Sequence, residues 1–360
     1  MSALVRRKST QFVVAVALTG LALTGCGKSE SSGSSGSTDS KAGAQVVKPA
    51  DENGPTCDLK QYGAKKIDLK NAVVGFSQSE KEDNPFRIAE TKSITDEAKK
   101  VGVKKFIHTN AQTQLSKQIS DINDMLAQGV QVLIVAPLNS DGLAPALKAA
   151  KAKGVPVLTV DRKLNGGACS DYVAFLGSNF TEQGKRAADQ LIKGTGGKGK
   201  VAVLLGASGN NVTTERTKGF VDELKAKGPG ISIVAQQTGE FARDKGQQVT
   251  EQLLQSNPEI TAIYAENDEM GLGALAAIQG AGKTPGKDIQ IYSIDGTRNA
   301  VQEIVNGTYN GVIESNPRFG PLAFQTLGDF LAGKKVYDNV VIQDRSYDAS
   351  NAKEGVKSAF

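Results

Sequence analysis

The 360-residue chain contains no tryptophan, one histidine and three cysteines, and aromatic residues make up 5% of it. No two cysteines have the Cys-x-x-Cys spacing of a redox or zinc site. The shortage of aromatic residues, together with the lack of a long basic block, leaves no platform that would stack on bases or neutralise phosphates. We therefore predict no metal, no cofactor and no nucleic-acid partner.

An export signal is predicted at the N-terminus. Arg6, Arg7 and Lys8 precede an apolar run over 12–23, whose last residue opens the sequence Leu-Thr-Gly before Cys26. A charged segment, a short apolar segment and a small-residue cleavage site are typical of secretory signals, and the run is shorter than the about 20 apolar residues of a spanning helix. Leu-Thr-Gly-Cys resembles a bacterial lipobox, which predicts lipid on Cys26. An uncleaved anchor and an ordinary secretory signal are the alternatives.

The basic surplus of the chain belongs mostly to this signal. Residues 1–25 hold three basic residues and no acidic one, so the 43 Lys and Arg fall to 40, against 38 Asp and Glu, after cleavage. Residues 27–44 are rich in Ser, Gly, Lys and Ala without apolar periodicity, as in a flexible tether. We assign 1–25 to the signal peptide and 26–70 to the lipidated cysteine and tether, and we expect the protein outside the cytoplasm, anchored to the outer face of the cell membrane.

Two cysteines remain once Cys26 carries lipid. Cys57 and Cys169 each lie in a segment rich in Gly, Asp or Ser. Disulfides form in exported proteins because those compartments are oxidising. We predict a Cys57–Cys169 disulfide; the alternative is two unrelated thiols, since the sequence does not fix the separation of their Cα atoms.

From residue 71 onward, short β-branched runs alternate with segments of helical periodicity. In the helix predicted over 113–128, Leu115, Ile119 and Leu126 fall on one face, and Gly129 ends the pattern. Two successive series in which each strand precedes a helix predict an α/β fold of two doubly wound, Rossmann-like lobes. The predicted strands are Ala72–Ser77, Lys104–Thr109, Val132–Ala136, Val155–Val160 and Tyr172–Leu176, then Lys200–Leu205, Ile231–Gln236, Ala262–Ala265, Gln290–Ile294 and Asn310–Ile313.

Polar and aromatic residues follow these strands, where doubly wound sheets bind ligands. They include planar donors, carboxylate acceptors and two phenylalanines. Sugars present hydroxyl groups that need donors and acceptors, and C–H faces that pack on aromatic rings. Local ion pairing, helix capping and core packing are the alternatives for single members. The candidates are Asn84, Phe86, Arg87, Asp161, Arg162, Arg216, Phe241, Asn267 and Asp295.

From residue 74 to the end, the chain resembles the ribose and galactose type of periplasmic sugar-binding proteins, which share the ligand domain of LacI-type repressors. The resemblance rests on the segments 74–78, 84–87, 160–162, 216–220, 266–270 and 293–296 together with Phe241. It implies two lobes joined by a hinge near Ser178, Glu314 and Asp344, with 71–177 and 315–344 in the N-terminal lobe and 178–314 and 345–360 in the C-terminal lobe. Asp161 and Arg162 would hold sugar hydroxyls from the first lobe, and Arg216, Asn267 and Asp295 from the second. Phe86 and Phe241 would close on the sugar faces, and Asn179 and Glu314 complete the predicted ligand set.

Within this family, the galactofuranose-binding type is the nearest likeness. It is carried by 75–78, Arg87, Ala136-Pro137, 239–245 and Glu314. A ribose binder would have an aromatic residue in place of Arg87 and Gln in place of Glu314, whereas Asn84-Pro85-Phe86 is ribose-like. We predict a monosaccharide ligand, with galactofuranose or galactose favoured and ribose or another aldose as alternatives. Arg87 and Glu314 are expected from different lobes, facing one ligand or pairing with each other.

The predicted function is capture of this sugar by a monomer and delivery to an ABC permease. A sensor that feeds a chemotaxis or kinase receptor is the second hypothesis, and an enzyme the third. The phosphate-loop-like run 194–200 is followed by Val201 instead of Ser or Thr, and it precedes a predicted strand. Asp161 and Asp295 resemble a glycosidase pair, but the neighbouring Arg162 and Arg298 predict ionised carboxylates.

Overall fold

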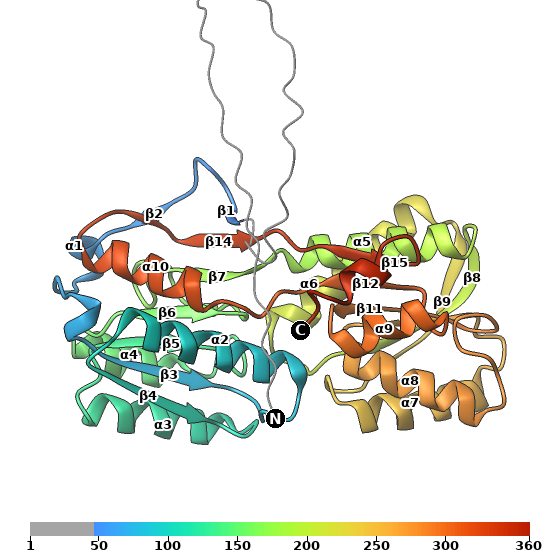
Figure 1. Cartoon of the computed structure of the whole chain (residues 1–360), viewed down its shortest axis with the longest axis horizontal. Coiled ribbons are helices and arrows are strands. Elements are labelled where there is room, and N and C mark those ends of the chain that lie inside the picture. The colour runs from blue at the N-terminus through green and yellow to red at the C-terminus, as the bar shows by residue number, and fades with distance from the viewer. Residues whose placement is uncertain (1–46) are drawn as a thin grey trace, which may run out of the picture. The chain divides into compact units, whose positions relative to one another are not determined.

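The structure, a computed structural model, describes residues 47–360. The predicted signal peptide, the lipidation site Cys26 and the tether as far as residue 46 lie outside the described residues. Two larger sheets organise the described part of the chain, and each forms a lobe with its helices (Figure 1). The fold class predicted from the alternating pattern is therefore confirmed.

Lobe 1 is built on a seven-stranded sheet in the order β1-β14-β7-β6-β5-β3-β4. All neighbouring strands are parallel except β1, which runs antiparallel to β14. The strands are β1 (Val47–Pro49), β3 (Val73–Gln78), β4 (Lys105–Asn110), β5 (Val132–Val135), β6 (Val157–Val160), β7 (Phe175–Ser178) and β14 (Asn339–Ile342), and the helices are α2 (Pro85–Val101), α3 (Leu115–Ala127), α4 (Ala144–Ala152) and α10 (Gly320–Leu331).

Lobe 2 has a six-stranded sheet in the order β15-β12-β11-β10-β8-β9, parallel except for the edge strand β15. Its strands are β8 (Lys198–Leu205), β9 (Gly230–Thr238), β10 (Ala262–Ala265), β11 (Gln290–Asp295), β12 (Gly311–Glu314) and β15 (Ser346–Asp348). Its helices are α5 (Phe180–Gly194), α6 (Asn211–Lys227), α7 (Arg243–Ser256), α8 (Asp268–Gly280), α9 (Arg298–Asn306) and α11 (Ala352–Gly355).

Strand β5 is apolar throughout because helices cover both faces of its sheet. Ile134 of β5 packs in one cluster with Ile94 of α2 and Leu327 of α10. Its neighbour Leu133 points to the other face and packs in a cluster with Met125 of α3. A continuous apolar run is thus the sequence expected of a strand with two cores.

The chain passes between the lobes three times. The crossings lie at Ser178 and Asn179 between β7 and α5, at 315–319 between β12 and α10, and at 343–345 between β14 and β15. They are next to the lobe boundaries predicted at 177/178, 314/315 and 344/345. These short crossings separate two halves that each have their own sheet.

Residues 47–71 differ from the prediction, because the predicted tether is folded after residue 46. β1 adds to the edge of β14, and Tyr62 is buried with its ring edge-on to Phe330. Pairing with a sheet edge and burial of an aromatic ring fix a segment whose composition alone suggested a linker. The other elements here are β2 (Thr56–Cys57), which pairs with β13 (Val336–Tyr337), α1 (Leu59–Tyr62) and the 3-10 helix η1 (Leu69–Asn71).

The helix expected after the strand at 155–160 is also missing. Residues 161–174 form an irregular connection from β6 to β7, and a turn in it is closed by the Asp171 carboxylate, which accepts from the backbone N–H of Gly167 at 2.7 Å. Asn, Gly and Asp are poor helix formers and favour such turns. The connection holds Asp161, Arg162 and Cys169.

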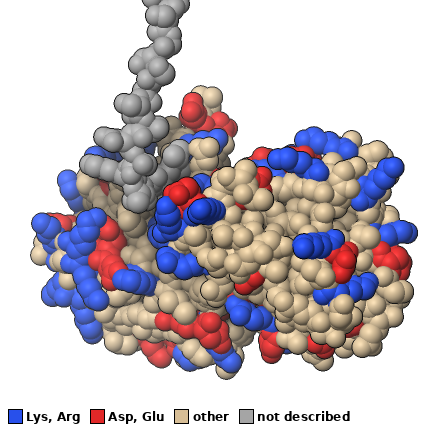
Figure 2. Space-filling view, turned by 45° about the vertical axis from the view of Figure 1, so that its right-hand side comes forward, with Lys and Arg blue, Asp and Glu red and all other residues tan. Residues whose placement is uncertain are grey.

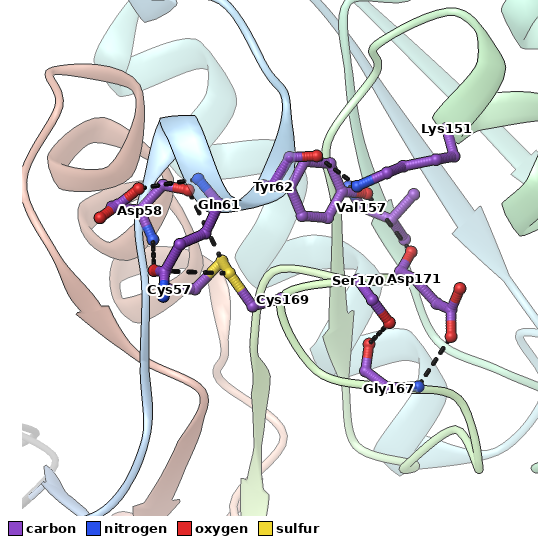
Figure 3. Close-up of a disulfide and its surroundings, with 10 residues drawn as sticks. All are labelled: Cys57, Asp58, Gln61, Tyr62, Lys151, Val157, Gly167, Cys169, Ser170 and Asp171. Carbon is purple, nitrogen blue, oxygen red and sulfur yellow. Dashed lines mark hydrogen bonds between the residues drawn. A yellow bond between two sulfur atoms is a disulfide. The ribbon is translucent and has the colours of Figure 1, made fainter.

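The predicted Cys57–Cys169 disulfide is present in the structure, with Cα atoms 5.1 Å apart (Figure 3). Beside it, Tyr62 donates its hydroxyl proton to the carbonyl of Asp171 and accepts from the backbone N–H of Val157, both at 3.3 Å. The disulfide and Tyr62 together attach residues 57–62 to lobe 1.

Charged side chains of both signs are interspersed over the face shown in Figure 2, with the densest grouping of Lys and Arg at its left-hand end. Within residues 47–360, no helix is both long enough and apolar enough to span a bilayer. In the same part of the chain, no group of three or more His, Cys, Asp and Glu side chains is arranged to hold a metal ion.

Candidate functional site

A pocket that is partly open to solvent lies between the two lobes. Nine of the eleven predicted ligand residues line it, together with Glu80 and Val212. The residues from lobe 1 are Glu80, Asn84, Phe86, Arg87, Asp161 and Arg162, and those from lobe 2 are Val212, Arg216, Phe241, Asn267 and Asp295. The strand-end rule for doubly wound sheets thus brought residues far apart in sequence to one place.

Helix caps position two of the lining residues. Asn84 begins α2 by accepting from the backbone N–H of Phe86 at 2.9 Å. Asn267 caps α8 through Met270, and its amide nitrogen also donates to the carbonyl of Phe241 at 3.1 Å. The capping role that we considered for Asn267 is therefore real, and it coexists with a place in the pocket.

Arg87 is the centre of an ion cluster on the lobe 1 side. Its guanidinium bonds to Glu80 at 2.9 Å, Glu90 at 2.8 Å and Asp161 at 2.7 Å, and the residue is only 4% exposed. Glu80 also accepts from Arg162 at 2.5 Å, so one carboxylate bridges two guanidinium groups. Buried charges of this kind need several partners each, and here they have them.

In this cluster, the pKa values of two carboxyl groups are shifted in opposite directions. Burial alone would raise the pKa of Glu80, but the charges of Arg162 and Arg87 outweigh it and lower the pKa to about 2. Burial raises the pKa of Glu90 to about 7, because Arg87 offsets only part of the desolvation. Glu80 is therefore ionised at neutral pH, whereas Glu90 gains or loses its proton close to neutral pH.

Arg216 is the corresponding cation of lobe 2. One of its terminal nitrogens donates to the carbonyl of Glu266 at 2.5 Å, and the other lies 3.7 Å from the carboxylate of Asp295. Burial raises the pKa of Asp295 well above its ordinary range, more than Arg216 lowers it. The lobe 2 carboxyl is thus far less firmly paired than those around Arg87.

Three of the seven non-glycine residues with positive φ in the described part of the chain line the pocket. Asp161 has φ 62°, Phe241 has φ 62° and Asp295 has φ 146°, values that residues other than glycine seldom adopt. Each costs on the order of 1–3 kcal/mol, and such residues persist mostly where function requires them. All three side chains line the pocket.

The lobes touch each other beside the pocket. The backbone N–H of Ser140 donates to the carbonyl of Gly209 at 3.0 Å, and the Arg162 guanidinium lies 5.8 Å from the centre of the Phe241 ring. Elsewhere, Phe86 packs edge-on against Phe360 at 6.1 Å between ring centres. The lobes are therefore closed over the pocket.

Residues 74–355 match the family described as the periplasmic binding protein domain. The chain belongs to this family. A ribose import binding protein of Bacillus subtilis (strain 168) is 38% identical over 272 residues, which are 75% of this chain and 85% of that protein. A galactofuranose-binding protein of Escherichia coli (strain K12) is 36% identical over 259 residues, 71% of this chain and 80% of that protein.

A solved structure of a periplasmic binding protein is also similar to this chain. The periplasmic binding protein of an arabinose ABC transporter from Shewanella sp. ANA-3, bound to α- and β-L-arabinofuranose, superposes with a TM-score of 0.76 at 33% identity, covering 79% of this chain and 94% of that one. The predicted arrangement of two doubly wound lobes, that of a type I periplasmic binding protein, is confirmed.

Two predicted ligand residues of this periplasmic binding protein lie outside the pocket lining. Glu314 is buried and accepts from Arg345 at 2.9 and 2.5 Å, so it does not pair with Arg87 as we considered. A buried carboxylate needs a cationic partner. Arg345 is close enough to be that partner, because it precedes β15, the strand that pairs with the strand of Glu314. Asn179 is exposed and caps α5 by accepting from Glu182 at 3.0 Å.

The neighbour expected to keep Asp295 ionised is also different. Arg298 donates to the carbonyl of Ala359 at 3.4 Å, and the cation nearest to Asp295 is Arg216. Because burial outweighs this pairing, the pKa of Asp295 is raised and not lowered. Although Arg298 is close to Asp295 in sequence, it begins helix α9, and its guanidinium bonds to Ala359 instead of Asp295.

Sequence reasoning missed two lining residues. Glu80 comes two positions after the end of β3, so the rule that selected Asp161 could have selected it as well. Val212 lies at the start of α6, and nothing in the sequence distinguishes it from a core residue. The lining contains three arginines and three carboxyl groups, a set that suits a neutral, hydroxyl-rich ligand.

Proposed function

We propose that this protein is the extracytoplasmic solute-binding lipoprotein of an ABC sugar importer and binds one monosaccharide between its lobes. The observation that carries the proposal is the pocket lining, with three guanidinium groups, three carboxyl groups and two phenylalanines. Guanidinium groups donate to hydroxyl oxygens, carboxylates accept from hydroxyl protons, and the rings pack on C–H faces. The acidic groups offset most of the cationic charge of the lining, which favours a neutral ligand over an ionic one.

A furanose sugar is the favoured ligand, with galactofuranose first. Arg87 supports it, because a guanidinium in place of a stacking ring adds donors for extra hydroxyl groups. Glu314 no longer contributes to this argument, since Arg345 holds it. Of the relatives described above, one is named as a galactofuranose-binding protein, one is bound to arabinofuranose and one is named for ribose, so ribose is the second candidate.

Binding and closure are coupled because the ligand touches both lobes. A sugar that contacts Asp161 and Asp295 together is bound only when the lobes are closed, so it shifts an open–closed equilibrium. The permease then distinguishes the closed form from the open one. Several charge-assisted hydrogen bonds of about 1.5–3 kcal/mol each leave micromolar or better affinity after the cost of closure.

Calorimetry with D-galactose, L-arabinose and D-ribose tests the ligand. We expect binding of galactose or arabinose to be tighter than that of ribose, and a loss of at least about tenfold in Asp295→Asn. Asp189→Asn, a surface residue paired with Lys227, is the matched control and should bind like the wild type. Tighter binding of D-ribose than of both D-galactose and L-arabinose would exclude the galactofuranose assignment, and equal affinities in the Asp295→Asn and Asp189→Asn variants would exclude this pocket.

The importer and the anchor need cell-based tests. Deletion of the gene should abolish uptake of the radiolabelled sugar, whereas normal uptake with a lost transcriptional or chemotactic response would favour the sensor. Cys26→Ser should abolish incorporation of labelled palmitate. Unchanged labelling in that variant would exclude the lipid anchor.

A further inference from the structure

Gln183 is a buried amide whose two ends are both bonded. It lies in the first turn of α5, is 1% exposed and does not line the pocket. Its oxygen accepts from Nε of Arg216 at 2.9 Å. Its nitrogen donates to the carboxylate of Asp344 at 2.7 Å and, at 3.3 Å, to the carbonyl of Glu314.

Arg216 is held against this same turn of α5. Its guanidinium lies 5.5 Å from the centre of the Phe180 ring, one helical turn before Gln183. Helices α5 and α6 approach backbone to backbone, since a Cβ at Gly184 would lie 2.2 Å from the carbonyl oxygen of Arg216 and one at Gly219 would lie 2.0 Å from that of Thr181. The position of the arginine therefore follows the start of α5.

Asp344 connects this pair to the crossings between the lobes. It lies in the crossing at 343–345, and its second carboxylate oxygen accepts from the backbone N–H of Asn316 in the crossing at 315–319, at 3.2 Å. Gln183 itself follows the remaining crossing, at Ser178 and Asn179, by four residues. One amide thus bonds an arginine of the pocket to a carboxylate that contacts the other crossings.

We propose that Gln183 is a positioning residue that orients Arg216 for the sugar and couples its orientation to the hinge. This inference rests on the proposed function and deepens it. Rotation of the lobes changes the backbone torsions of the crossings, and with them the place of Asp344 relative to α5. With Nε fixed by Gln183 and one terminal nitrogen fixed by Glu266, the remaining nitrogen of Arg216 faces Asp295 and the ligand.

The chemistry of the chain requires an amide at this position. Arg216 offers only donors and the ionised Asp344 only acceptors, so the residue between them must accept on one side and donate on the other. Glutamate would place a second carboxylate against Asp344, and methionine would fill the space without either bond. The exchange Gln183→Glu with Asp344→Asn reverses the polarity of the pair, conserves the charge and restores the bond to Arg216 and the bond between the two residues, so that only the 3.3 Å bond to the carbonyl of Glu314 is lost.

The test compares Gln183→Met, Gln183→Glu and the double exchange with the wild type, using D-galactose in calorimetry. Gln190→Met is the matched control, because Gln190 lies on the same helix and donates to the carbonyl of Tyr347 in lobe 2, away from the crossings. We expect an about tenfold loss of affinity in both single Gln183 variants, recovery to within about threefold in the double exchange, and no change in the control. Failure of the double exchange to recover affinity would mean that Gln183 acts through packing alone.

A second measurement is independent of the sugar. Hydrogen exchange of the Asn316 amide, measured without ligand, should be several-fold faster in Gln183→Met than in the wild type, and slow again in the double exchange. If wild-type protein binds no galactose, the proposed ligand is wrong, while the exchange rates still decide the link to the crossings. The inference would be overturned by an unchanged exchange rate at Asn316 in Gln183→Met. It would also be overturned if the wild type binds galactose and Gln183→Met binds it with the same affinity.

Discussion

Removal of Arg87 should be among the most destabilising single changes in lobe 1. Arg87→Met keeps the apolar stem and leaves Glu80, Glu90 and Asp161 without the guanidinium that bonds to all three at 2.7–2.9 Å. Loss of one partner of a buried ion pair costs about 3–5 kcal/mol, because the other charge stays buried and uncompensated. We expect a fall of this size in the free energy of unfolding at pH 8, measured by urea titration with circular dichroism.

The pH dependence separates this explanation from lost packing. The pKa of Glu80 is lowered to about 2, so its ion pairs stabilise the folded protein fully above the unfolded pKa of about 4.3, and this contribution is lost as pH falls from there toward 2. Arg87→Met lacks part of that contribution. The part of the gap that comes from Glu80 should therefore be full above about pH 5 and narrow as the pH is lowered. Glu90, whose pKa is about 7 even beside Arg87, should widen the gap further as the pH rises through 7.

Arg243→Met is the control for this experiment. Arg243 pairs with Glu269 at 2.8 Å, but its side chain is 48% exposed. An exposed pair is worth about 0–1 kcal/mol. If Arg87→Met costs no more than Arg243→Met, or if its cost is the same at pH 4 and pH 8, then the cluster around Arg87 does not stabilise the fold as an ion network.

Three further changes test other parts of the structure. Removal of the disulfide by Cys57→Ser with Cys169→Ser should lower the free energy of unfolding by up to about 4–5 kcal/mol, because it closes a loop with a sequence separation of 112; two free thiols in the oxidised, denatured wild type would contradict the bond. Burial raises the pKa of Glu266 to about 7, so the folded state binds more protons than the unfolded state between about pH 4.5 and 7, and stability falls as pH rises through this window. In urea titrations, Glu266→Gln should reduce the fall in the free energy of unfolding between pH 4.5 and 8 by about 3 kcal/mol. The same dependence of this free energy on pH in variant and wild type would refute the prediction. Phe360→Ala removes the ring that packs on Phe86 across the lobes, so galactose affinity should fall by about two- to tenfold, with an unaltered affinity as the contrary result.

Local rules predicted much of the fold and of the site. The strand Val132–Val135 and the helix Leu115–Ala127 were predicted to within a residue or two, because periodicity and helix-ending residues are written in adjacent positions. The strand-end rule found Asp161 and Asp295 for the same reason: it needs only the end of a strand and the residue that follows it.

The features that the sequence did not reveal depend on partners far along the chain. Glu314 was assigned to the ligand on the family resemblance, whereas in the structure it pairs with Arg345, which precedes the antiparallel strand β15. The fold of residues 47–71 depends likewise on the edge of β14 and on the contact of Tyr62 with Phe330. Gln183 is an ordinary helical glutamine until α6 and the crossing at 343–345 surround it.

The attachment of β1 to β14 determines which lobe the N-terminal segment joins. Val47 pairs with Ile342, directly before the crossing at 343–345, and the disulfide at Cys57 fastens the following segment to the same lobe. Whatever holds the chain ahead of Val47 therefore holds lobe 1, close to the axis on which the lobes turn. Lobe 1 is thus the lobe that the N-terminal segment holds, and lobe 2 turns relative to it. A force on that segment acts near the hinge and therefore has little effect on closure.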